Sequence, residues 1–420
     1  MKEAAIKAGN THSGALALFV LMLVSIFNYL DRTIISILQV PIKRELLLSD
    51  AQLGLMTGLA FALFYSTLGV PVARLADRFS RKYVIAASLF LWSAMTALSG
   101  FSTGFATLVF FRIGVALGEA GSIPASHSVI ADCYPPDRRA TAIGIWGLAL
   151  PIGVMLGYLS GGWLAQAIDW RAALWIIGGI GVLLVPIVLY FLHEPPRGRF
   201  ETTAVPEAPP WRDALAVMLR QKSLLMLFAG GALNNFVLSM ALNWNAPFYA
   251  RVHAMALGDV ATALALMTGI GGGVGIFLGG WLTDRIGVTD ARRRPQLTGW
   301  AMIAVVPAAL IQFLTDSAQV SLVAGGVAVM LLFFYYSPII AMTQSLVPAS
   351  MRAFTSSILL LTVNIVGLGL GPWLTGILSD MLGGDAQGLR YAMTSLSLLG
   401  IAAGGCFLLA SRWYREDILK

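Results

Sequence analysis

The sequences Leu75-Ala76-Asp77-Arg78 and Leu282-Thr283-Asp284-Arg285 decide the fold class, because nearly the same four residues recur 207 positions apart. Each follows a long uncharged segment. A second pair of similar segments, Pro135–Ala140 (PPDRRA) and Pro348–Ala353 (PASMRA), recurs at 213 positions. Repeats of this size in a chain of 420 residues indicate two structurally related halves.

The composition is typical of a membrane protein. Charged residues make up 12% of the chain and hydrophobic residues 57%, whereas about 25% of an average soluble domain is charged. The mean hydropathy is +0.78. This balance argues against a disordered chain and a nucleic-acid-binding domain, and the two cysteines, Cys133 and Cys406, are too few for a disulfide scaffold.

Ten long uncharged windows, together with two largely apolar segments at about 16–40 and 105–131, predict twelve membrane-spanning helices, because each can hold the roughly 20 apolar residues that a span requires. The turn-forming cluster Ser99–Gly104 divides the window 83–111 between two helices. The first segment is too long for a cleaved signal peptide, so we expect it to remain as a span. The predicted spans are about 16–40, 51–73, 83–99, 105–131, 140–168, 172–193, 223–250, 260–283, 295–315, 317–351, 353–379 and 391–411.

Positive charge gathers on one side of these spans. With the N-terminus in the cytoplasm, 21 of the 28 Lys and Arg residues fall on the cytoplasmic side and five on the other. The positive-inside rule therefore predicts that both termini are cytoplasmic. We expect a multi-pass protein of a bacterial inner membrane.

The segment 193–222, which is rich in Pro, Glu and Arg, predicts a cytoplasmic linker. It would separate an N-terminal six-helix lobe, residues 1–192, from a C-terminal six-helix lobe, residues 223–420. The sequence thus predicts an all-α membrane protein with two pseudo-symmetric lobes, which we expect to be a monomer. The fifth and eleventh spans are rich in glycine, which indicates either close helix packing or flexing.

The motifs resemble the major facilitator superfamily along the whole chain. Ala73–Lys82 (ARLADRFSRK) is similar to that superfamily's G-x-x-x-D-R-x-G-R-K motif, although Ala73 and Ser80 replace its two glycines, and Gly280–Gly287 (GWLTDRIG) keeps both. Within the superfamily the chain is most similar to the spinster family. The residues that carry this second resemblance are Asn28–Arg32, Arg112–Ala120, Ile130–Asp132, Leu150–Gly153 and Gly157-Tyr158.

The resemblance implies the major facilitator fold and a secondary transporter that exports an amphipathic lipid, such as a lysophospholipid or a sphingoid phosphate, coupled to protons. Related motifs on the first and fourth helices also occur in anion:cation symporters, so uptake of a small organic acid is an alternative. A channel or receptor is an alternative of another class, but it would not need repeated Asp-Arg pairs. We expect no enzyme, cofactor, metal site or nucleic-acid partner, because the sequence lacks the corresponding motifs.

Four ionisable residues fall inside the predicted spans, Asp31 and Arg32 in the first and Arg112 and Glu119 in the fourth. Four unpaired charges would cost roughly 10 to 14 kcal/mol on insertion scales. They are therefore expected to face a wet cavity or one another. Arg112 and Glu119 lie on one helix face but about 10 Å apart, so pairs between the two helices are favoured.

Glu119 is our first choice for the proton-coupling residue and Asp31 the second, with Arg32 and Arg112 as anion ligands or counter-charges. A buried carboxyl group favours its protonated form, and a nearby arginine favours the charged form. An arginine that moves, or that binds an anionic substrate, would therefore change where the proton resides. The alternative is a static network of ion pairs that fixes helix packing.

The second half has no charge inside its predicted spans. A charged wall that faces an apolar, amide-lined wall suits an amphiphile better than a sugar. Each candidate substrate-binding residue could instead be a helix-packing contact. With Tyr29 of the first half, these candidates are Asn235, Tyr335, Tyr336 and Asn364.

The repeated Asp-Arg pairs predict a cytoplasmic gate, in which a carboxylate accepts hydrogen bonds from a helix N-terminus and from an arginine of the other lobe. The resemblance implies that this cluster closes the cytoplasmic side in the outward-open state. Anchoring by the positive-inside rule would explain isolated cations but not a repeated pair. The gate residues are Asp77, Arg78 and Arg81 after the second span, and Asp284 and Arg285 after the eighth.

Overall fold

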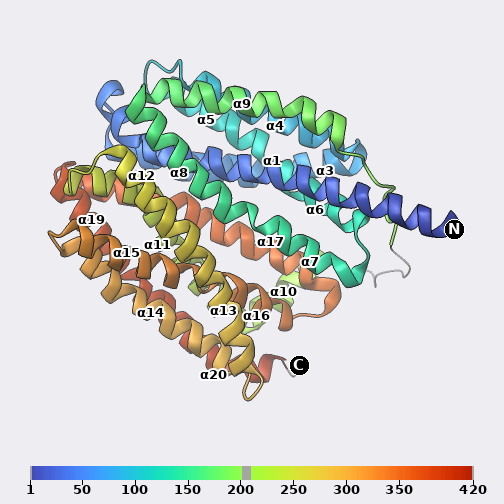
Figure 1. Ribbon diagram of the computed structural model, residues 1–420. Coiled ribbons are helices and arrows are strands. Elements are labelled where there is room, and N and C mark those ends of the chain that lie inside the picture. Colours follow the sequence, from blue (N-terminus) through green and yellow to red (C-terminus); the bar gives the residue numbers. More distant parts are fainter. Residues whose placement is uncertain (1, 201–209, 419–420) are drawn as a thin grey trace. The chain divides into compact units, whose positions relative to one another are not determined.

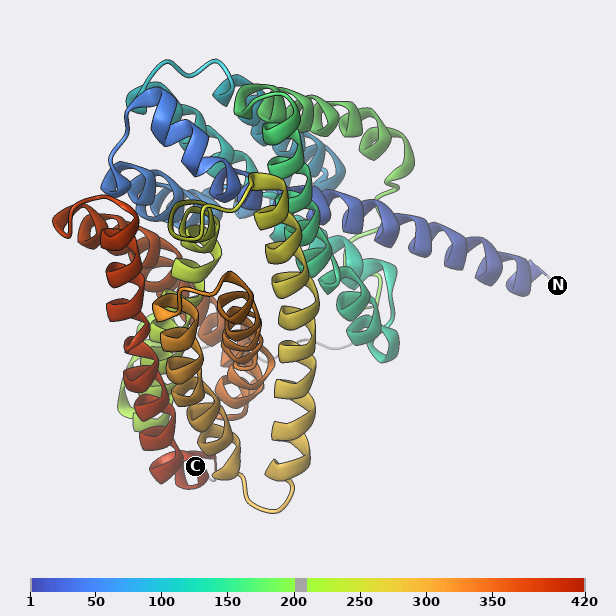
Figure 2. The ribbon, with the colours of Figure 1, turned by 60° about the vertical axis from the view of Figure 1, so that its left-hand side comes forward.

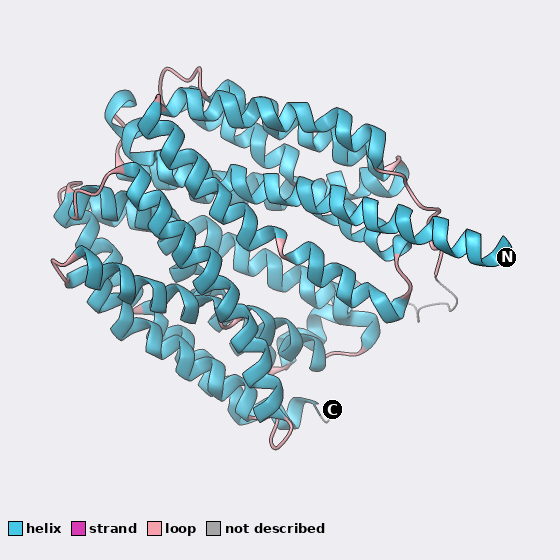
Figure 3. Ribbon diagram, viewed as in Figure 1, coloured by secondary structure: helices cyan, strands magenta, loops and turns pink. Residues whose placement is uncertain are grey.

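The computed structural model describes residues 2–200 and 210–418 (Figure 1). Within that part of the chain every regular element is a helix (Figure 3). Twelve stretches are long and apolar enough to cross a membrane, which confirms the predicted all-α membrane protein with twelve spans. The stretches are Gly14–Leu46, Asp50–Gly69, Arg81–Ser99, Phe105–Cys133, Thr141–Ala167, Trp170–Phe191, Lys222–Val252, Leu257–Gly287, Arg293–Leu314, Ala318–Ser345, Phe354–Met381 and Ala386–Ile418.

The chain divides into two compact units. The first contains Met1–Leu46 and Ala60–Ala204, and the second contains Leu47–Leu59 and Val205–Lys420. Residues 47–59 precede the linker in sequence but group with the second half, and the predicted linker, residues 193–222, is divided between the two units after Ala204.

The first unit contains the charged residues of the first and fourth spans. Its fifth span approaches the first helix closely, since a Cβ at Gly153 would lie 2.6 Å from the carbonyl oxygen of Ile26, and a Cβ at Gly157 would lie 2.8 Å from that of Leu30. These glycines therefore serve close packing. The helices are α1 Lys2–Leu46, α3 Phe61–Arg78, α4 Arg81–Ser99, α5 Phe105–Glu119, α6 Ser122–Cys133, α7 Pro136–Gly147, α8 Ala149–Ala167 and α9 Trp170–Phe191.

Three π-helical stretches, η1, η2 and η4, lie in the second unit, apart from Ala60 at the end of η1. Such stretches are often found at functional positions. The elements are α2 Asp50–Gly54, η1 Leu55–Ala60, α10 Trp211–Arg220, α11 Lys222–Val252, α12 Leu257–Leu266, η2 Met267–Gly271, α13 Gly272–Gly287, α14 Arg293–Leu314, α15 Ala318–Phe333, α16 Tyr336–Ser345, η3 Ala349–Met351, α17 Arg352–Thr362, η4 Val363–Leu370, α18 Gly371–Met381, α19 Ala386–Ser397 and α20 Leu399–Ile418. Figure 2 shows α13 and α14 running antiparallel on either side of a short loop.

The helices of the second half run past the apolar windows and include charges near their ends. The seventh span runs to Val252 and includes Arg251, and the eleventh runs to Met381 and includes Asp380. Both charges have partners in the second unit. Arg251, for example, lies 2.9 Å from the carboxylate of Asp50, whose side chain is completely buried.

Candidate functional site

Two ion pairs join the first and fourth spans within the first unit. Arg112 Nη1 lies 3.5 Å from Asp31 Oδ2, and Arg32 Nε donates a hydrogen bond to Glu119 Oε2 at 2.5 Å. The side chains of Asp31, Arg112 and Glu119 are no more than 4% exposed, and that of Arg32 is 21% exposed. The structure thus brings the four ionisable residues together, while their roles in transport stay predictions.

Helix geometry explains this pairing. Neighbouring residues of a helix point about 100° apart, so Asp31 and Arg32 reach different partners. Those partners are seven residues apart on α5 and share one of its faces. A Cβ at Gly118 would lie 2.6 Å from the backbone nitrogen of Trp92. The close approach of α4 and α5 that this glycine permits buries Glu119 completely.

Aromatic rings surround the guanidinium group of Arg32. Its central carbon lies 4.5 Å from the ring centroid of Tyr65, 5.3 Å from that of Phe61 and 5.9 Å from that of Tyr29. The Phe61 ring also lies 5.5 Å from the guanidinium carbon of Arg112. Cation–π attraction to these rings partly compensates both cations for lost hydration.

Thr96 completes the surroundings of Asp31. Its hydroxyl group donates a hydrogen bond to Asp31 Oδ1 at 2.5 Å, and both residues are buried. Sequence reasoning missed Thr96, Phe61 and Tyr65, because nothing in the sequence indicates which faces of the second and third spans meet the first.

Each of the four charged residues has a buried polar atom without a hydrogen-bond partner among the described residues. Three of these atoms are Arg32 Nη2, Arg112 Nε and Glu119 Oε1, and the fourth is Asp31 Oδ2, whose contact with Arg112 is the 3.5 Å ion pair. Unpaired polar atoms in a low-dielectric interior are costly. The network therefore retains bonding capacity for a proton, water or an anionic group.

The candidates of the second half lie in the second unit, and two of them contact each other. Tyr335 Oη donates a hydrogen bond to Asn235 Oδ1 at 3.3 Å, and Asn235 Nδ2 donates one to the carbonyl oxygen of Val363 at 3.0 Å. Tyr336 packs edge-on against Tyr335 and is 39% exposed. Asn364 is half-buried in η4. Asn235 therefore connects α11 to Tyr335, between α15 and α16, and to Val363 in the π-helical part of the eleventh span.

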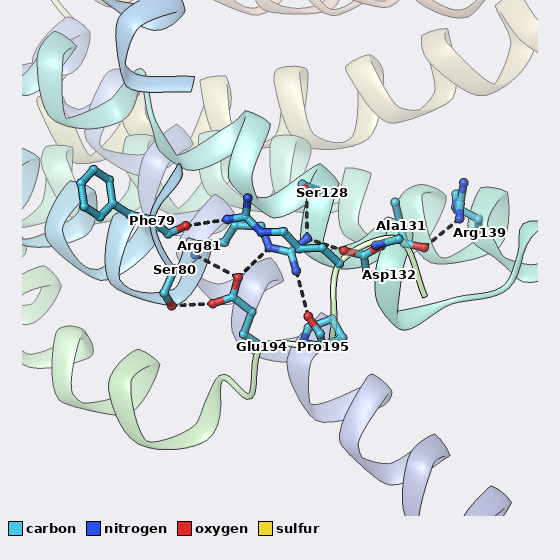
Figure 4. A network of polar contacts seen from close by, with 11 residues as sticks. Phe79, Ser80, Arg81, Ser128, Ala131, Asp132, Arg139, Glu194 and Pro195 are labelled. Atoms are coloured by element: carbon cyan, nitrogen blue, oxygen red, sulfur yellow. Dashed lines mark hydrogen bonds and ion pairs between the residues drawn. The ribbon is translucent and has the colours of Figure 1, made fainter. Parts of the chain in front are cut away.

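Arg81, one of the predicted gate residues, is the centre of a polar network within the first unit (Figure 4). It is 2% exposed and donates hydrogen bonds to the carboxylates of Asp132 and Glu194, the latter at 2.8 Å. It also donates to Ser128 Oγ at 2.9 Å and to the carbonyl oxygen of Pro195 at 2.9 Å. Arg81 thereby joins the starts of the third span and of the linker to the end of the fourth span.

The linker is fixed to this network at several points. Glu194 accepts hydrogen bonds from Ser80 Oγ and from the backbone N–H of Arg81, and Asp132 accepts one from the backbone N–H of Gly198. Sequence reasoning missed Asp132 and Glu194 as partners of Arg81. The available signal was the pair of acidic residues beside basic segments, one at the end of the fourth span and one after the sixth.

The remaining gate candidates are placed differently. Arg78 is exposed, and the side chain of Asp77 lies outside the described residues. Asp284 and Arg285 are also exposed, and the Arg285 guanidinium carbon lies 5.4 Å from the ring centroid of Trp281. In the described part of the chain, no three His, Cys, Asp or Glu residues are grouped to hold a metal ion.

The Glu194 carboxylate predicts an acid-sensitive contribution to stability. Burial raises its pKa, but hydrogen bonds from Ser80 and Arg81 outweigh that effect, so the pKa lies below its ordinary value of 4.5. The contribution is therefore fully present above about pH 4.5 and is lost as the pH falls through the lower pKa of the folded protein. The difference in thermal midpoint between the wild type and Glu194→Gln should be constant above this pH and shrink below it.

A control and a contradicting result follow from the same experiment. The Glu416 side chain is 63% exposed, so Glu416→Gln should match the wild type at every pH. A Glu194→Gln difference that persists or grows on acidification would contradict the assignment of the stabilising form to the ionised carboxylate.

Comparisons with known proteins agree with the helical architecture. The family model of the Major Facilitator Superfamily matches residues 21–368. An MFS-type efflux pump of Mycolicibacterium smegmatis is 34% identical over 411 residues, which cover 96% of this chain and 94% of that protein. Protein spinster homolog 1 of Xenopus laevis is 25% identical over 448 residues, which cover 100% of this chain and 85% of the relative.

A solved structure is similar along nearly the whole chain. It is a bacterial homologue of the human lysosomal transporter spinster in an inward-facing, unoccupied conformation. The two chains superimpose with a TM-score of 0.88 at 29% sequence identity, and the match covers 96% of this chain and 98% of the other.

Proposed function

Since the chain belongs to the Major Facilitator Superfamily, whose members are transporters and not enzymes, we propose that it is a proton-coupled secondary transporter. Its substrate is an amphipathic, lipid-like molecule with an anionic group, and it works by alternating access. Membrane lipids, this substrate and protons are its partners, and it acts as a monomer in the bacterial inner membrane with both termini in the cytoplasm.

The observation that carries the proposal is the pair of buried ion pairs, Asp31–Arg112 and Arg32–Glu119. Such pairs are a poor source of stability compared with apolar packing, and ionisable residues inside a membrane commonly mark ion and substrate pathways. The unpartnered Arg32 Nη2 and Arg112 Nε atoms offer two donors to an anionic headgroup. When an anion binds Arg32, Glu119 loses its counter-charge and takes up a proton.

The surroundings of Arg32 favour an amphiphile. A headgroup that binds this guanidinium lies beside the rings of Phe61 and Tyr65, which can contact the apolar carbon atoms next to the charge. A small organic acid would use the arginines but gain little from the rings. Uptake of such an acid, as in the anion:cation symporters, is therefore the second candidate.

Thermal stabilisation separates these substrates. A lysophospholipid should raise the unfolding temperature, since a ligand present at 100 times its Kd stabilises by about 2.7 kcal/mol. A monoacylglycerol, which has the chain but not the charge, and a small dicarboxylate should have little effect. The lysophospholipid shift should disappear in Arg32→Gln. Stabilisation by the dicarboxylate alone would favour the symporter alternative, and equal stabilisation by both lipids would refute recognition of the anionic group.

A further inference from the structure

Polar side chains continue from the ion pairs of the first unit toward the N-terminal end of α1. Ser25, Asn28 and Arg32 follow one another at intervals of three and four residues, so they share one face of the helix. Ser25 is 2% exposed, and Asn28 is completely buried. This face therefore places two small polar groups in the interior of the first unit, next to the pair that Arg32 forms with Glu119.

A second polar face lies on α6, which packs beside α1 (Figure 1). The two residues between α5 and α6 keep helical backbone angles, so the helical turn continues from Glu119 into α6. Ser122 and Ser126 follow Glu119 by three and seven residues and therefore share its face. Both are no more than 2% exposed. Since Glu119 binds Arg32 of α1, this buried polar face of α6 is directed toward α1.

The α1 side of this interface has unused hydrogen-bonding capacity. Asn28 Nδ2, Asn28 Oδ1 and Ser25 Oγ are buried and have no hydrogen-bond partner among the described residues, and the same holds for Glu119 Oε1. A buried amide group that neither donates nor accepts is costly. Amide and hydroxyl groups suit water, which also donates and accepts, and a buried water makes about three hydrogen bonds. We call Ser25, Asn28, Ser122 and Ser126 the polar seam.

Apolar residues close the polar seam at the end remote from Glu119. Leu21 lies seven residues before Asn28, on the same face of α1, and is completely buried. Ile130 continues the α6 face four residues after Ser126 and is 1% exposed. An apolar constriction excludes water. The seam is therefore polar beside Glu119 and sealed toward the N-terminal end of α1.

We propose that the polar seam binds a short chain of water molecules through which Glu119 exchanges its proton with the cytoplasm. Asn28 is the positioning residue of this chain, and Leu21 and Ile130 form its seal. A proton that passes the seal moves from one water to the next, and the last water gives a proton to Glu119 Oε1. Each water that gives a proton receives another, so no water is consumed, and release runs in reverse. The route rests on the proton-coupled part of the proposed function.

The charged groups that act on Glu119 lie on α1 and α5. Arg32 and Asp31 of α1 and Arg112 of α5 interact with its carboxylate electrostatically. From α3, Tyr65 contacts the Arg32 guanidinium group. The other titratable residues of the neighbouring helices lie farther along them, namely Arg74, Asp77 and Arg78 toward the end of α3, Arg81, Lys82 and Tyr83 in the first turn of α4, and His127, Asp132 and Cys133 in α6. No residue of the polar seam is ionisable, so a proton that enters it has Glu119 as its acceptor.

Infrared spectroscopy of the Glu119 carboxyl group tests the route without a transport assay. The carbonyl band of the protonated group is identified by its absence from Glu119→Gln. After a rapid drop in pH in detergent, the band should appear at a rate set by proton entry. Asn28→Leu keeps the size of the side chain but cannot bind water, so it should slow the band at least tenfold and leave its final amplitude unchanged. If Asn28 were merely structural, the substitution would loosen the interface and speed the band.

Variants at the seal should act in the opposite direction. Leu21→Ser and Ile130→Ser extend the two polar faces and should each speed the band at least tenfold, because the constriction becomes wettable. Ile34→Ser is the matched control, since Ile34 is also completely buried on α1 but faces α8, where a Cβ at Gly161 would lie 2.8 Å from its Cγ1. Thr33→Val removes a buried polar group from the same α8 contact. Both controls should keep the wild-type rate.

The outcomes are decisive even where a single variant folds poorly, because the two sets change different residues and have opposite effects. Wild-type rates in Asn28→Leu and Leu21→Ser would overturn the route, and so would equal acceleration by Leu21→Ser and Ile34→Ser. The assay uses neither substrate nor a pH gradient. The expected rates in a chain that moves no protons with its substrate would therefore refute the coupling and not the route. A wild-type chain in which no pH brings out the Glu119 band would refute both.

Discussion

Glu119→Gln is expected to reduce pH-driven substrate flux in proteoliposomes to the level of protein-free vesicles, while the protein keeps its fold. Glutamine has the size of glutamate and can still accept a hydrogen bond from Arg32, which lies 2.5 Å from the carboxylate. It cannot bind and release a proton. Flux under an imposed pH gradient and the unfolding temperature in detergent, measured on the same preparation, check both parts of the expectation.

A matched acidic residue provides the control. Glu45 lies on α1, the helix that carries Arg32, and pairs with Arg171 at 2.8 Å, but its side chain is 49% exposed. Glu45→Gln should change flux by less than about twofold, because an exposed ion pair contributes about 0–1 kcal/mol. If Glu119→Gln unfolded the protein, or if it retained gradient-driven flux, the ion pair would be structural and the proton site would lie elsewhere.

Arg112→Met is expected to destabilise the fold by about 3–5 kcal/mol, because it leaves the Asp31 carboxylate buried without a counter-charge at that position. Thr96 would still donate one hydrogen bond to Asp31, but a hydroxyl group does not neutralise the charge. The midpoint of denaturant-induced unfolding in detergent measures the loss. Arg32→Gln should cost less, since Arg32 is partly exposed and Glu119 can become neutral by binding a proton.

The double variant Asp31→Asn with Arg112→Met tests the reason for this loss. It removes both charges and should recover most of the stability, as replacement of a complete buried ion pair is often nearly neutral. A double variant as unstable as Arg112→Met alone would instead indicate that packing of the arginine side chain, and not the unpaired carboxylate, accounts for the effect.

The sequence was sufficient to predict the spans and the grouping of the charged residues. Largely apolar segments located all twelve spans, since a helix in hydrocarbon must be predominantly apolar. The cost of isolated charges in the membrane then required Asp31, Arg32, Arg112 and Glu119 to find partners or water. Arg112 and Glu119 are seven residues apart on α5, too far to pair with each other, so pairs with Asp31 and Arg32 of α1 were favoured.

Other parts of the site depend on tertiary contacts that the sequence does not reveal. Thr96, Phe61 and Tyr65 lie in apolar helices whose orientation about their axes is set by packing. The window 51–73 is one uninterrupted apolar run, so it gave no sign that residues 47–59 would group with the second half. The windows also ended before Arg251 and Asp380, because a hydropathy criterion stops at a charge while the helix itself continues.

Movement of protons on addition of substrate tests the central claim most directly. Proteoliposomes would contain a pH-sensitive dye with no initial pH gradient, and a lysophospholipid would be added outside. The coupled mechanism predicts a change of internal pH that depends on the substrate, is absent with a protonophore and is absent in Glu119→Gln. Substrate flux through the wild-type protein with no accompanying pH change would contradict proton coupling by the Asp31–Arg112 and Arg32–Glu119 pairs.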